Sequence, residues 1–402
     1  MRSAFLNIFW QYTLQALNVV IPLLTFKIII DRISFSQFGE LALILVIINY
    51  AKVFLDFGFS IKGPVLLNES EKKGKNLIQD ISNILFCKII ISFFILLILL
   101  VVSIFIDVYI VMVFLILFFF AFNMNYYFNY KEKSKILTFI SLFEKLTFFC
   151  LIYFIFNEQN YFETYLLFLL ISSFISAFLN LYFISKNEKK PIFKIIIPQT
   201  KFKLIYYASS GSHQFLINIA NGLFTYSIIP IVTYFFGSYQ AGIYASAEKL
   251  IKACQLLVSP LISGIQKFLL NNVTKKKLLV LFLFGVFVFS ILSFVVFYYS
   301  EYLSGLIIDN EINLVSEITS ILSISILASF MFTFCNVILL NKINNESHLK
   351  YLFLFIYLIG IILFIYSEQT DLIYFAWEIF VLELIILLYT THIALKKIFF
   401  SL

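Results

Sequence analysis

The chain has 402 residues, of which 62% are hydrophobic and only 13% are charged. Soluble domains are about half apolar and about a quarter charged, so this composition excludes an ordinary soluble enzyme. The net charge of +7 comes almost entirely from lysine. In a soluble protein such a charge would suit nucleic acid, but the placement of the lysines indicates membrane orientation instead.

Long apolar runs recur through the chain, for example at 89–106, 109–122 and 278–297. A run of about 18 or more apolar residues crosses the roughly 30 Å hydrocarbon layer of a bilayer. Continuous apolarity, without alternation at every second residue, favours helices over a β-barrel. The predicted spans are 6–30, 38–61, 81–105, 107–126, 136–156, 163–185, 207–236, 242–269, 277–299, 316–340, 349–366 and 371–395. We therefore expect an all-α, polytopic membrane protein of about twelve spans, and we interpret its first apolar segment as a span, not as a cleavable signal peptide.

Lysines gather in every second loop between the predicted spans. With the N-terminus in the cytoplasm, the cytoplasmic loops carry groups such as Lys131 and Lys133, whereas the opposite loops carry acidic residues such as Glu158 and Asp309. Basic residues favour the cytoplasmic side of a membrane. The alternation predicts an even number of spans with both termini in the cytoplasm.

The second half of the chain repeats polar positions of the first half at a shift of 203 residues. Polar identities inside apolar helices arise by chance less often than matches of leucine with leucine. The pairs are Gln11 with Gln214, Asn18 with Asn221, Gln37 with Gln240 and Gly39 with Gly242. The shift predicts two six-helix lobes in a parallel repeat, at 1–200 and 201–402, around a central cavity.

Four predicted spans, the first, second, seventh and eighth, carry a polar stripe along one helical face. Polar side chains in a span are costly and tend to face a bundle interior or a wet cavity. Because these spans occupy matching places in the two halves, we expect their stripes to line one shared cavity. The candidate cavity residues are Gln11, Gln15, Asn18, Asn49, Lys52, Asp56, Gln214, Asn218, Asn221, Glu248, Lys249, Lys252 and Gln255.

Simpler explanations of these stripes stay open. Lys52 and Asp56 lie one turn apart and could merely neutralise each other. Amide stripes also hold helices together without lining any cavity. Lys88 lies near the cytoplasmic end of its span, where snorkelling to the interface is an alternative to burial.

Sequence signatures of catalysis are missing. The chain contains no GxxxxGK[ST] phosphate loop, no HExxH and no GxSxG, and its four cysteines form no CxxC pair. We therefore expect neither a cofactor nor a metal site, and a transporter instead of an enzyme.

The residues also carry a family resemblance. The second span, with Phe-Gly-Glu-Leu at 38–41 and Asp-Phe-Gly-Phe at 56–59, resembles the second span of bacterial polysaccharide flippases. The segment 241–251, AGIYASAEKLI, resembles their eighth span, and the polar first helix at 7–22 matches as well. These flippases belong to the multidrug/oligosaccharidyl-lipid/polysaccharide exporter superfamily. Relatives often use arginine in the cavity, whereas this chain has arginine only at positions 2 and 32.

The resemblance implies that the chain flips undecaprenyl-diphosphate-linked oligosaccharide repeat units of O-antigen (lipopolysaccharide) or capsule across the bacterial inner membrane by alternating access. The partners that it implies are the lipid-linked glycan and the bilayer, with a polysaccharide polymerase and a chain-length regulator as further candidates. One alternative is a multidrug exporter of the same superfamily, although cationic drugs call for acidic cavities and lysines outnumber carboxylates on the stripes. A second alternative is a membrane polysaccharide polymerase or ligase, which usually needs a sizeable external loop.

The energy source for transport is also open. Without a nucleotide-binding loop, export draws on the substrate's own gradient, on a partner ATPase or on coupled H⁺ or Na⁺. A carboxylate within a span is costly when charged and is a natural proton or cation site. Glu383 has no charged neighbour within a turn in sequence, which makes it our ion-coupling candidate.

Overall fold

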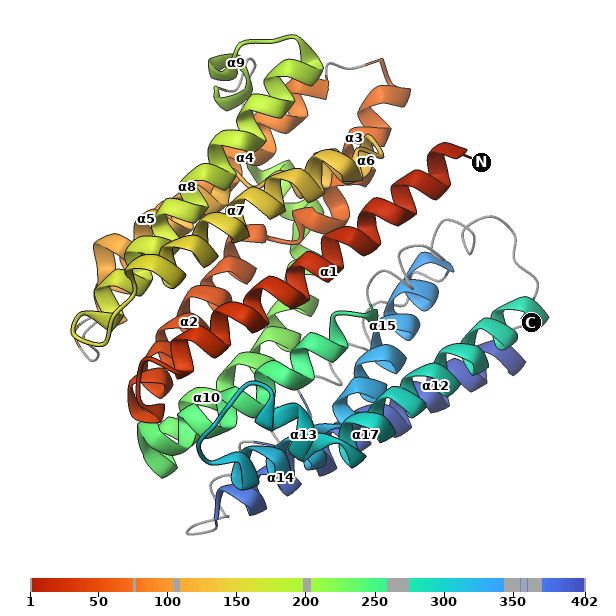
Figure 1. The fold of residues 1–402 in the computed structure, drawn as a ribbon. Helices are drawn as coiled ribbons and strands as arrows, with labels where there is room; N and C mark the ends of the chain where they lie inside the picture. Colours follow the sequence, from red (N-terminus) through yellow and green to blue (C-terminus); the bar gives the residue numbers. More distant parts are fainter. Residues whose placement is uncertain are drawn as a thin grey trace. The chain divides into compact units, whose positions relative to one another are not determined.

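The computed structural model describes residues 2–74, 77–102, 104, 109–197, 204–258, 275–342, 355, 360 and 371–400, and all regular elements in this part of the chain are helices (Figure 1). The predicted all-α class is thereby confirmed. The helices are α1 (Arg2–Ile30), α2 (Phe35–Asp56), α3 (Phe59–Lys72), α4 (Leu77–Val102), α5 (Ile110–Ala121), α6 (Asn125–Tyr130), α7 (Ser134–Ile155), α8 (Tyr161–Glu188), α9 (Ile192–Ile196), α10 (Leu204–Gln255), α12 (Lys275–Tyr298), α13 (Ser300–Gly305), α14 (Ile312–Leu322), α15 (Ile324–Lys342) and α17 (Leu372–Phe400).

Within the described residues, nine segments are long and apolar enough to cross a membrane, so the chain is a multi-pass membrane protein. They correspond to the first six predicted spans and to the ninth, tenth and twelfth. The predicted seventh span and the start of the eighth lie in α10, which has a non-helical residue inside it, Gly237 (φ 83°, ψ 170°). The end of the eighth span and nearly all of the eleventh lie outside the described residues.

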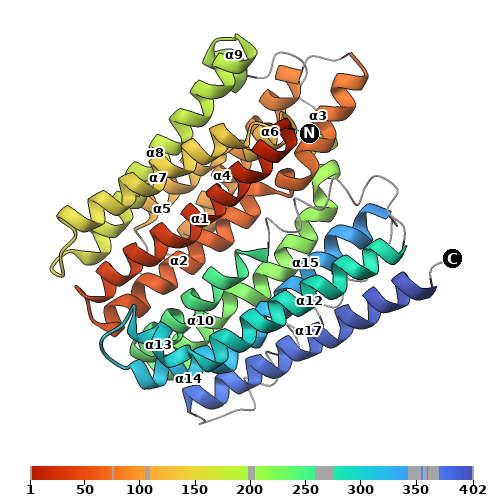
Figure 2. The ribbon, with the colours of Figure 1, turned by 45° about the vertical axis from the view of Figure 1, so that its right-hand side comes forward.

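The chain divides into two compact units. Unit 1 comprises Met1–Ile33 and Leu43–Ser227, and unit 2 comprises Ser34–Ala42 and Ile228–Leu402. In unit 1, α1 packs on α7, α5 and α7 pack on α8, α4 packs on α5, and α3 packs on α6. In unit 2, α15 packs on α17 and α12, and α13 packs on α14 (Figure 2). The predicted lobes at 1–200 and 201–402 stay a prediction.

Two glycines of the sequence repeat meet inside unit 2. A Cβ added to Gly39 would lie 1.9 Å from the carbonyl oxygen of Ser238, and one added to Gly242 would lie 2.1 Å from that of Phe35. Each glycine therefore rests on the carbonyl group four residues before the other glycine. Only residues without a side chain allow two helices to cross so closely, which explains glycine at both positions.

Three predicted spans are interrupted, although the sequence predicts continuous helices. The second span breaks into α2 and α3 at Phe57 (φ 48°) and Gly58 (φ 77°), both of which have left-handed backbone angles. The fourth span breaks between α5 and α6, at 122–124, and the tenth is interrupted at Ser323. Apolar run length does not reveal such breaks, because they depend on contacts with other helices.

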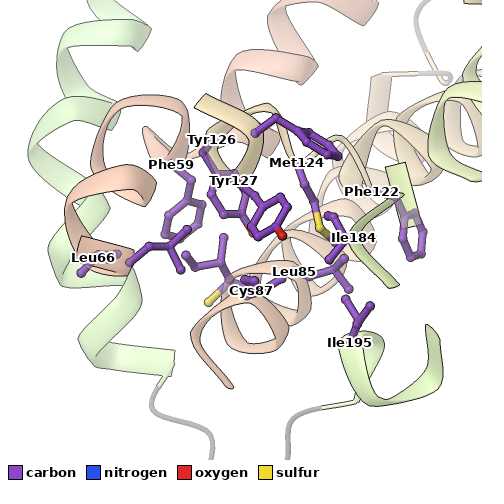
Figure 3. Packing of buried hydrophobic residues seen from close by; sticks show 14 of the residues in the cluster. Phe59, Leu66, Leu85, Cys87, Phe122, Met124, Tyr126, Tyr127, Ile184 and Ile195 are labelled. Carbon is purple, nitrogen blue, oxygen red and sulfur yellow. The ribbon is translucent and has the colours of Figure 1, made fainter. Parts of the chain in front are cut away.

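Unit 1 contains two separate apolar clusters. The α5 cluster joins α2, the C-terminal half of α4, α5 and α8; its buried members are Ile44, Ile48, Ala51, Leu55, Ile95, Leu99, Val113, Ile116, Leu117, Ala121 and Leu166. The α6 cluster gathers around Tyr126 and Tyr127 (Figure 3). It also includes Phe59, Leu66, Leu67, Ile81, Ile84, Leu85, Cys87, Phe122, Met124, Phe128, Leu137, Ile140, Ala177, Ile184, Ile195 and Tyr207. At the two helix breaks of this unit the chain passes from one cluster to the other, whereas α4 and α8 cross between the clusters without a break.

Candidate functional site

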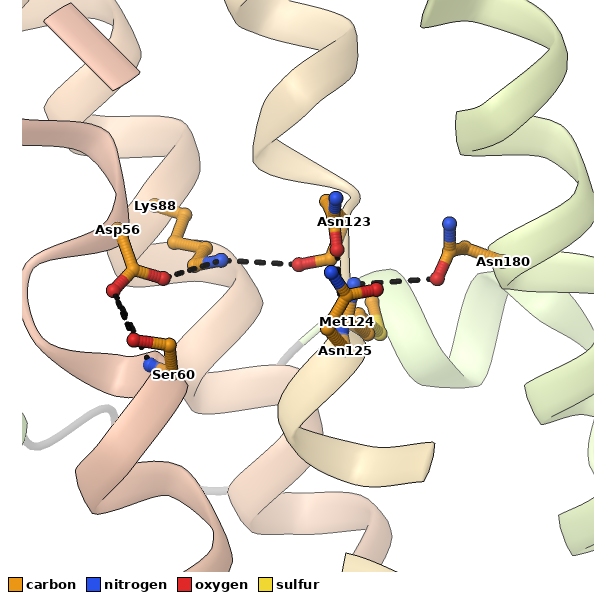
Figure 4. Close-up of polar contacts among 7 residues, drawn as sticks. All are labelled: Asp56, Ser60, Lys88, Asn123, Met124, Asn125 and Asn180. Atoms are coloured by element: carbon orange, nitrogen blue, oxygen red, sulfur yellow. Dashed lines mark hydrogen bonds and ion pairs between the residues drawn. The ribbon is translucent and has the colours of Figure 1, made fainter. Parts of the chain in front are cut away.

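Lys88 is the most deeply buried charged residue in the described part of unit 1. It lies on α4 with 2% of its surface exposed, and its Nζ is 3.7 Å from Asp56 Oδ1. The same Nζ donates a hydrogen bond of 3.0 Å to the carbonyl oxygen of Asn123 (Figure 4). It also lies 5.7 Å from the ring centre of Tyr126. Lys88 therefore does not snorkel, and Asp56 pairs with it and not with Lys52.

The other groups around this pair hold the ends of α3 and α6. Asp56 Oδ2 accepts hydrogen bonds from the backbone N–H (3.3 Å) and the hydroxyl (2.8 Å) of Ser60 in the first turn of α3. Asn180 Oδ1, from α8, accepts one of 3.3 Å from the N–H of Met124, directly before α6. These side chains satisfy backbone groups that a helix break leaves without partners.

Contacts with α10 fix the backbone of the α2–α3 break. The ring of Phe57 stacks on that of Phe215 with centres 4.2 Å apart. A Cβ added to Gly58 would lie 2.9 Å from the carbonyl oxygen of Gly211 and from Cβ of Gln214. The left-handed angles and the close packing both require glycine at position 58. The Asp-Phe-Gly-Phe sequence at 56–59 is thus a charge partner, a stacking ring, a turn and a core residue in succession.

Lys52, one turn before Asp56, has a different environment. Its Nζ lies 5.2 Å from the ring centre of Phe120, and it interacts electrostatically with Glu144 on α7. Asp56, one turn later on the same helix, pairs with Lys88 and not with Lys52. An ammonium over an aromatic ring is attracted by the electron-rich face of that ring.

The amide stripe of α1 contacts a neighbouring helix. Asn18 Nδ2 donates to Gln15 Oε1 (3.0 Å), and Asn18 Oδ1 accepts from the hydroxyl of Ser141 on α7 (3.1 Å). This favours the alternative, in which amides hold helices together, for Asn18. Gln11 and Asn49 are half-buried in the same unit.

The amide stripe of α10 is more deeply buried. Gln214 is 4% exposed, and its Nε2 donates to Asn218 Oδ1 (3.1 Å) along the helix. The side chain of Asn221 lies outside the described part of the structure.

Unit 2 holds the remaining candidates. Lys252 Nζ lies 2.7 Å from Oε1 of the buried Glu248, one turn earlier on α10, so its charge is compensated. Lys249 Nζ lies 4.6 Å from the ring centre of Phe38. Gln255 Nε2 donates to the hydroxyl (3.0 Å) and the carbonyl (3.2 Å) of Ser325 on α15.

Glu383 belongs to the same neighbourhood of unit 2. It lies half-buried on α17, and the buried Tyr244 of α10 interacts electrostatically with both Glu383 and Glu248. Sequence proximity does not reveal this neighbour, because the two helices are far apart along the chain. Tyr244 is thus a common electrostatic neighbour of the ion-coupling candidate and Glu248.

Arg32 has a structural role. Its guanidinium donates to the carbonyl oxygens of Ile152 (2.9 Å), Tyr153 (2.8 Å) and Phe156 (2.7 Å) at the C-terminal end of α7. A cation at this end satisfies free carbonyl groups and complements the helix dipole. Within the described side chains, the intramembrane positive charge is therefore lysine.

The described residues contain no group of three or more His, Cys, Asp or Glu side chains that could hold a metal ion. The polar groups instead combine ammonium, carboxylate and amide side chains inside apolar helices. Such groups can bind charged and hydroxylated ligands within a membrane.

Comparison with protein families supplies the identification. The sequence matches the model of the polysaccharide biosynthesis protein family over residues 5–265. The chain belongs to this family. The match confirms the resemblance seen in the sequence, and it covers Lys52, the Asp56–Lys88 pair and the Glu248–Lys252 pair. A search of curated proteins gave no significant match.

Solved structures show the same fold for this family member. One similar structure is described as the outward-facing conformation of a multidrug resistance MATE family transporter of the MOP superfamily. The two share 10% sequence identity with a TM-score of 0.61, and the alignment covers 99% of this chain and 96% of the other. At this identity, the likeness establishes the fold alone.

The sequence analysis did not include Lys88 among the candidate site residues. The feature that could have indicated it is a lysine inside a 26-residue apolar helix. Its position near a span end favoured snorkelling, and its partners Asp56 and Asn123 come from two other helices.

Proposed function

We propose that this polysaccharide biosynthesis family member flips undecaprenyl-diphosphate-linked oligosaccharide repeat units, of O-antigen or capsule, across the bacterial inner membrane by alternating access. The observation that carries the proposal is the family match over residues 5–265. The fold shared with a transporter and the polar side chains within apolar helices support it further.

Three candidate lysines bear on the headgroup. Lys52 and Lys249 lie over the rings of Phe120 and Phe38, and Lys252 lies beside Glu248. A diphosphate carries negative charge that an ammonium binds as a point charge. We assign headgroup binding to Lys52, Lys249 and Lys252, and sugar hydroxyls to the amide side chains.

Deletion of the gene tests this function in the native bacterium. Loss of a flippase should cause single lipid-linked repeat units to accumulate in the cytoplasmic leaflet. Restoring the wild-type gene should remove this accumulation. Drug sensitivity with normal surface glycan would indicate a multidrug exporter. Normal flipping with unpolymerised or unligated glycan would indicate a polymerase or ligase.

We also propose that H⁺ or Na⁺ drives transport through Glu383. A carboxylate within a span can exchange a proton or cation as its surroundings change, and Glu383 shares the electrostatic neighbour Tyr244 with Glu248. We expect Glu383→Gln, which mimics the protonated acid, to lose the stimulation of flipping by an imposed pH or Na⁺ gradient in vesicles. Glu317→Gln, at an exposed position of α14, is the matched control. If wild-type flipping ignores both gradients and Glu383→Gln behaves as wild type, export runs downhill.

A further inference from the structure

Two helices of unit 1 break within reach of one side chain. Lys88 contacts Asp56, the last residue of α2, and the carbonyl group of Asn123, between α5 and α6. The segments beyond the two breaks, α3 and α6, pack on each other. They are also joined by a hydrogen bond that Tyr130 donates to Glu71. The two short helices therefore form a pair that can shift together.

The breaks coincide with a boundary between the two apolar clusters of this unit. Leu55 belongs to the α5 cluster and Phe59 to the α6 cluster, although only three residues separate them. Ala121 and Phe122 are likewise divided between the clusters. Polar groups occupy the boundary: the Asp56–Lys88 pair with its partners Ser60 and Asn123, and Asn180, which accepts a hydrogen bond from the N–H of Met124 (Figure 4).

A polar boundary and an apolar one respond differently to motion. Interdigitated apolar side chains resist sliding because their packing is close and specific. A lysine at the end of a flexible four-carbon stem keeps its electrostatic contacts over a range of angles. Two positive-φ residues, Phe57 and Gly58, already interrupt the backbone here.

We propose that the Asp56–Lys88 pair is the hinge of unit 1, with Lys88 as the positioning residue about which α3 and α6 tilt relative to α2 and α5. The role of this hinge in flipping rests on the proposed transport function, whereas the motion itself does not. Its motion is a property of the protein without substrate and can be measured as such.

Hydrogen exchange of the full-length protein in lipid nanodiscs tests the motion. In the wild type, amides at 57–62 and 122–126 should exchange faster than those in the middle of α7 and α8. The two segments should exchange at the same rate as each other. Lys88→Met should speed both segments together. Tyr127→Phe, which removes the 2.6 Å hydrogen bond from α6 to Glu188 away from the hinge, should leave the 57–62 segment unchanged. Unrelated responses of the two segments to Lys88→Met would overturn the proposal.

A double variant separates a hinge from a merely structural ion pair. Asp56→Leu combined with Lys88→Met fills the boundary with apolar groups of similar size and removes both charges. A structural pair predicts that this variant regains wild-type exchange and flipping. The hinge predicts exchange at both segments, and flipping in vesicles, at least tenfold slower than in the wild type.

The neutral polar pair Asp56→Asn with Lys88→Gln keeps the boundary polar and should retain coupled exchange. If the apolar double variant does not insert into the membrane, this neutral polar variant replaces it in the test. Independent exchange of segments 57–62 and 122–126 in the neutral polar variant would then overturn the hinge. If the wild type shows coupled exchange but flips no glycan, the proposed function is refuted and the hinge is kept. If the wild type flips glycan and the apolar double variant behaves as wild type, the hinge is refuted and the proposed function is kept.

Discussion

Helix α5 of unit 1 and helix α14 of unit 2 are followed by different kinds of interruption. The 203-residue shift places α5, before its break, on α14, before the interruption at Ser323. In unit 1 the backbone leaves helical angles at Phe122 (φ −80°, ψ 1°) and Met124 (φ −117°, ψ 42°). In unit 2, Ser323 keeps right-handed helical angles (φ −57°, ψ −29°). Unit 1 thus has a true break, whereas unit 2 has a local distortion.

The side chains that donate hydrogen bonds to these interruptions also differ, because one is charged and the other is neutral. Lys88 Nζ donates to the Asn123 carbonyl in unit 1, and the hydroxyl of Ser293 donates to the Ser323 carbonyl (2.8 Å) in unit 2. The repeat partner of Lys88 is Ile291, an exposed apolar residue. Hydrogen bonds from charged donors are about twice as strong as neutral ones. The stronger donor therefore accompanies the larger loss of helix geometry.

The largest effect that we expect from this difference comes from Lys88→Met. The substitution leaves the half-buried Asp56 carboxylate without its ammonium partner. Breaking a buried pair by removing one partner typically lowers the free energy of unfolding by about 3–5 kcal/mol. Chemical unfolding in detergent micelles measures it. Lys73→Met, at an exposed ion pair with Glu69 (3.6 Å), is the control and should change stability by less than about 1 kcal/mol. Similar losses in the two variants would mean that the buried pair contributes no more than a surface pair.

The sequence could predict the spans but not these interruptions. Run length and hydropathy decide whether a segment crosses a bilayer, and nine predicted spans are confirmed on that basis. The breaks depend on side chains far away in sequence, such as Lys88 for Asn123 and Phe215 for Phe57. Local spacing cannot supply such contacts.

The candidate site shows the same limit. Glu248 and Lys252 pair one turn apart, as helical spacing allows. The equally spaced Lys52 and Asp56 do not pair, because Lys88 from another helix reaches the carboxylate. A spacing rule gives the possible partners within one helix, and packing decides among them.

The crossing of Gly39 and Gly242, in contrast, is symmetric, so we expect equal effects from the two alanine substitutions. Each added methyl group would meet a backbone carbonyl oxygen, at 1.9 Å and 2.1 Å. Overpacking of this kind typically costs about 1–3 kcal/mol. Gly305→Ala, where the nearest atom is 3.9 Å away, is the control. Unfolding measurements that gave one large and one negligible effect would contradict the symmetric crossing.

Lys52 and Lys249 offer a functional comparison between the units. Their ammonium groups lie over phenyl rings at 5.2 Å and 4.6 Å, so we expect Lys52→Met and Lys249→Met to impair flipping to a similar degree. A loss of about tenfold each corresponds to about 1.4 kcal/mol of binding free energy. Flipping rates in vesicles at equal protein content measure the effect, with Lys73→Met as the control. Unchanged rates in both variants would remove the headgroup role from these lysines.

Ser293→Ala should have the smallest effect, a loss of about 1 kcal/mol in the free energy of unfolding. The Ser323 carbonyl that its hydroxyl contacts also accepts a backbone hydrogen bond of 3.1 Å from the N–H of Ile326. Removal of the hydroxyl therefore leaves an acceptor that is still satisfied, and no buried charge remains behind. The same unfolding experiment that is used for Lys88→Met gives the comparison directly. If Ser293→Ala costs as much as Lys88→Met, the serine contact is as important as the buried ion pair, and the contrast between a charged break and a neutral distortion fails.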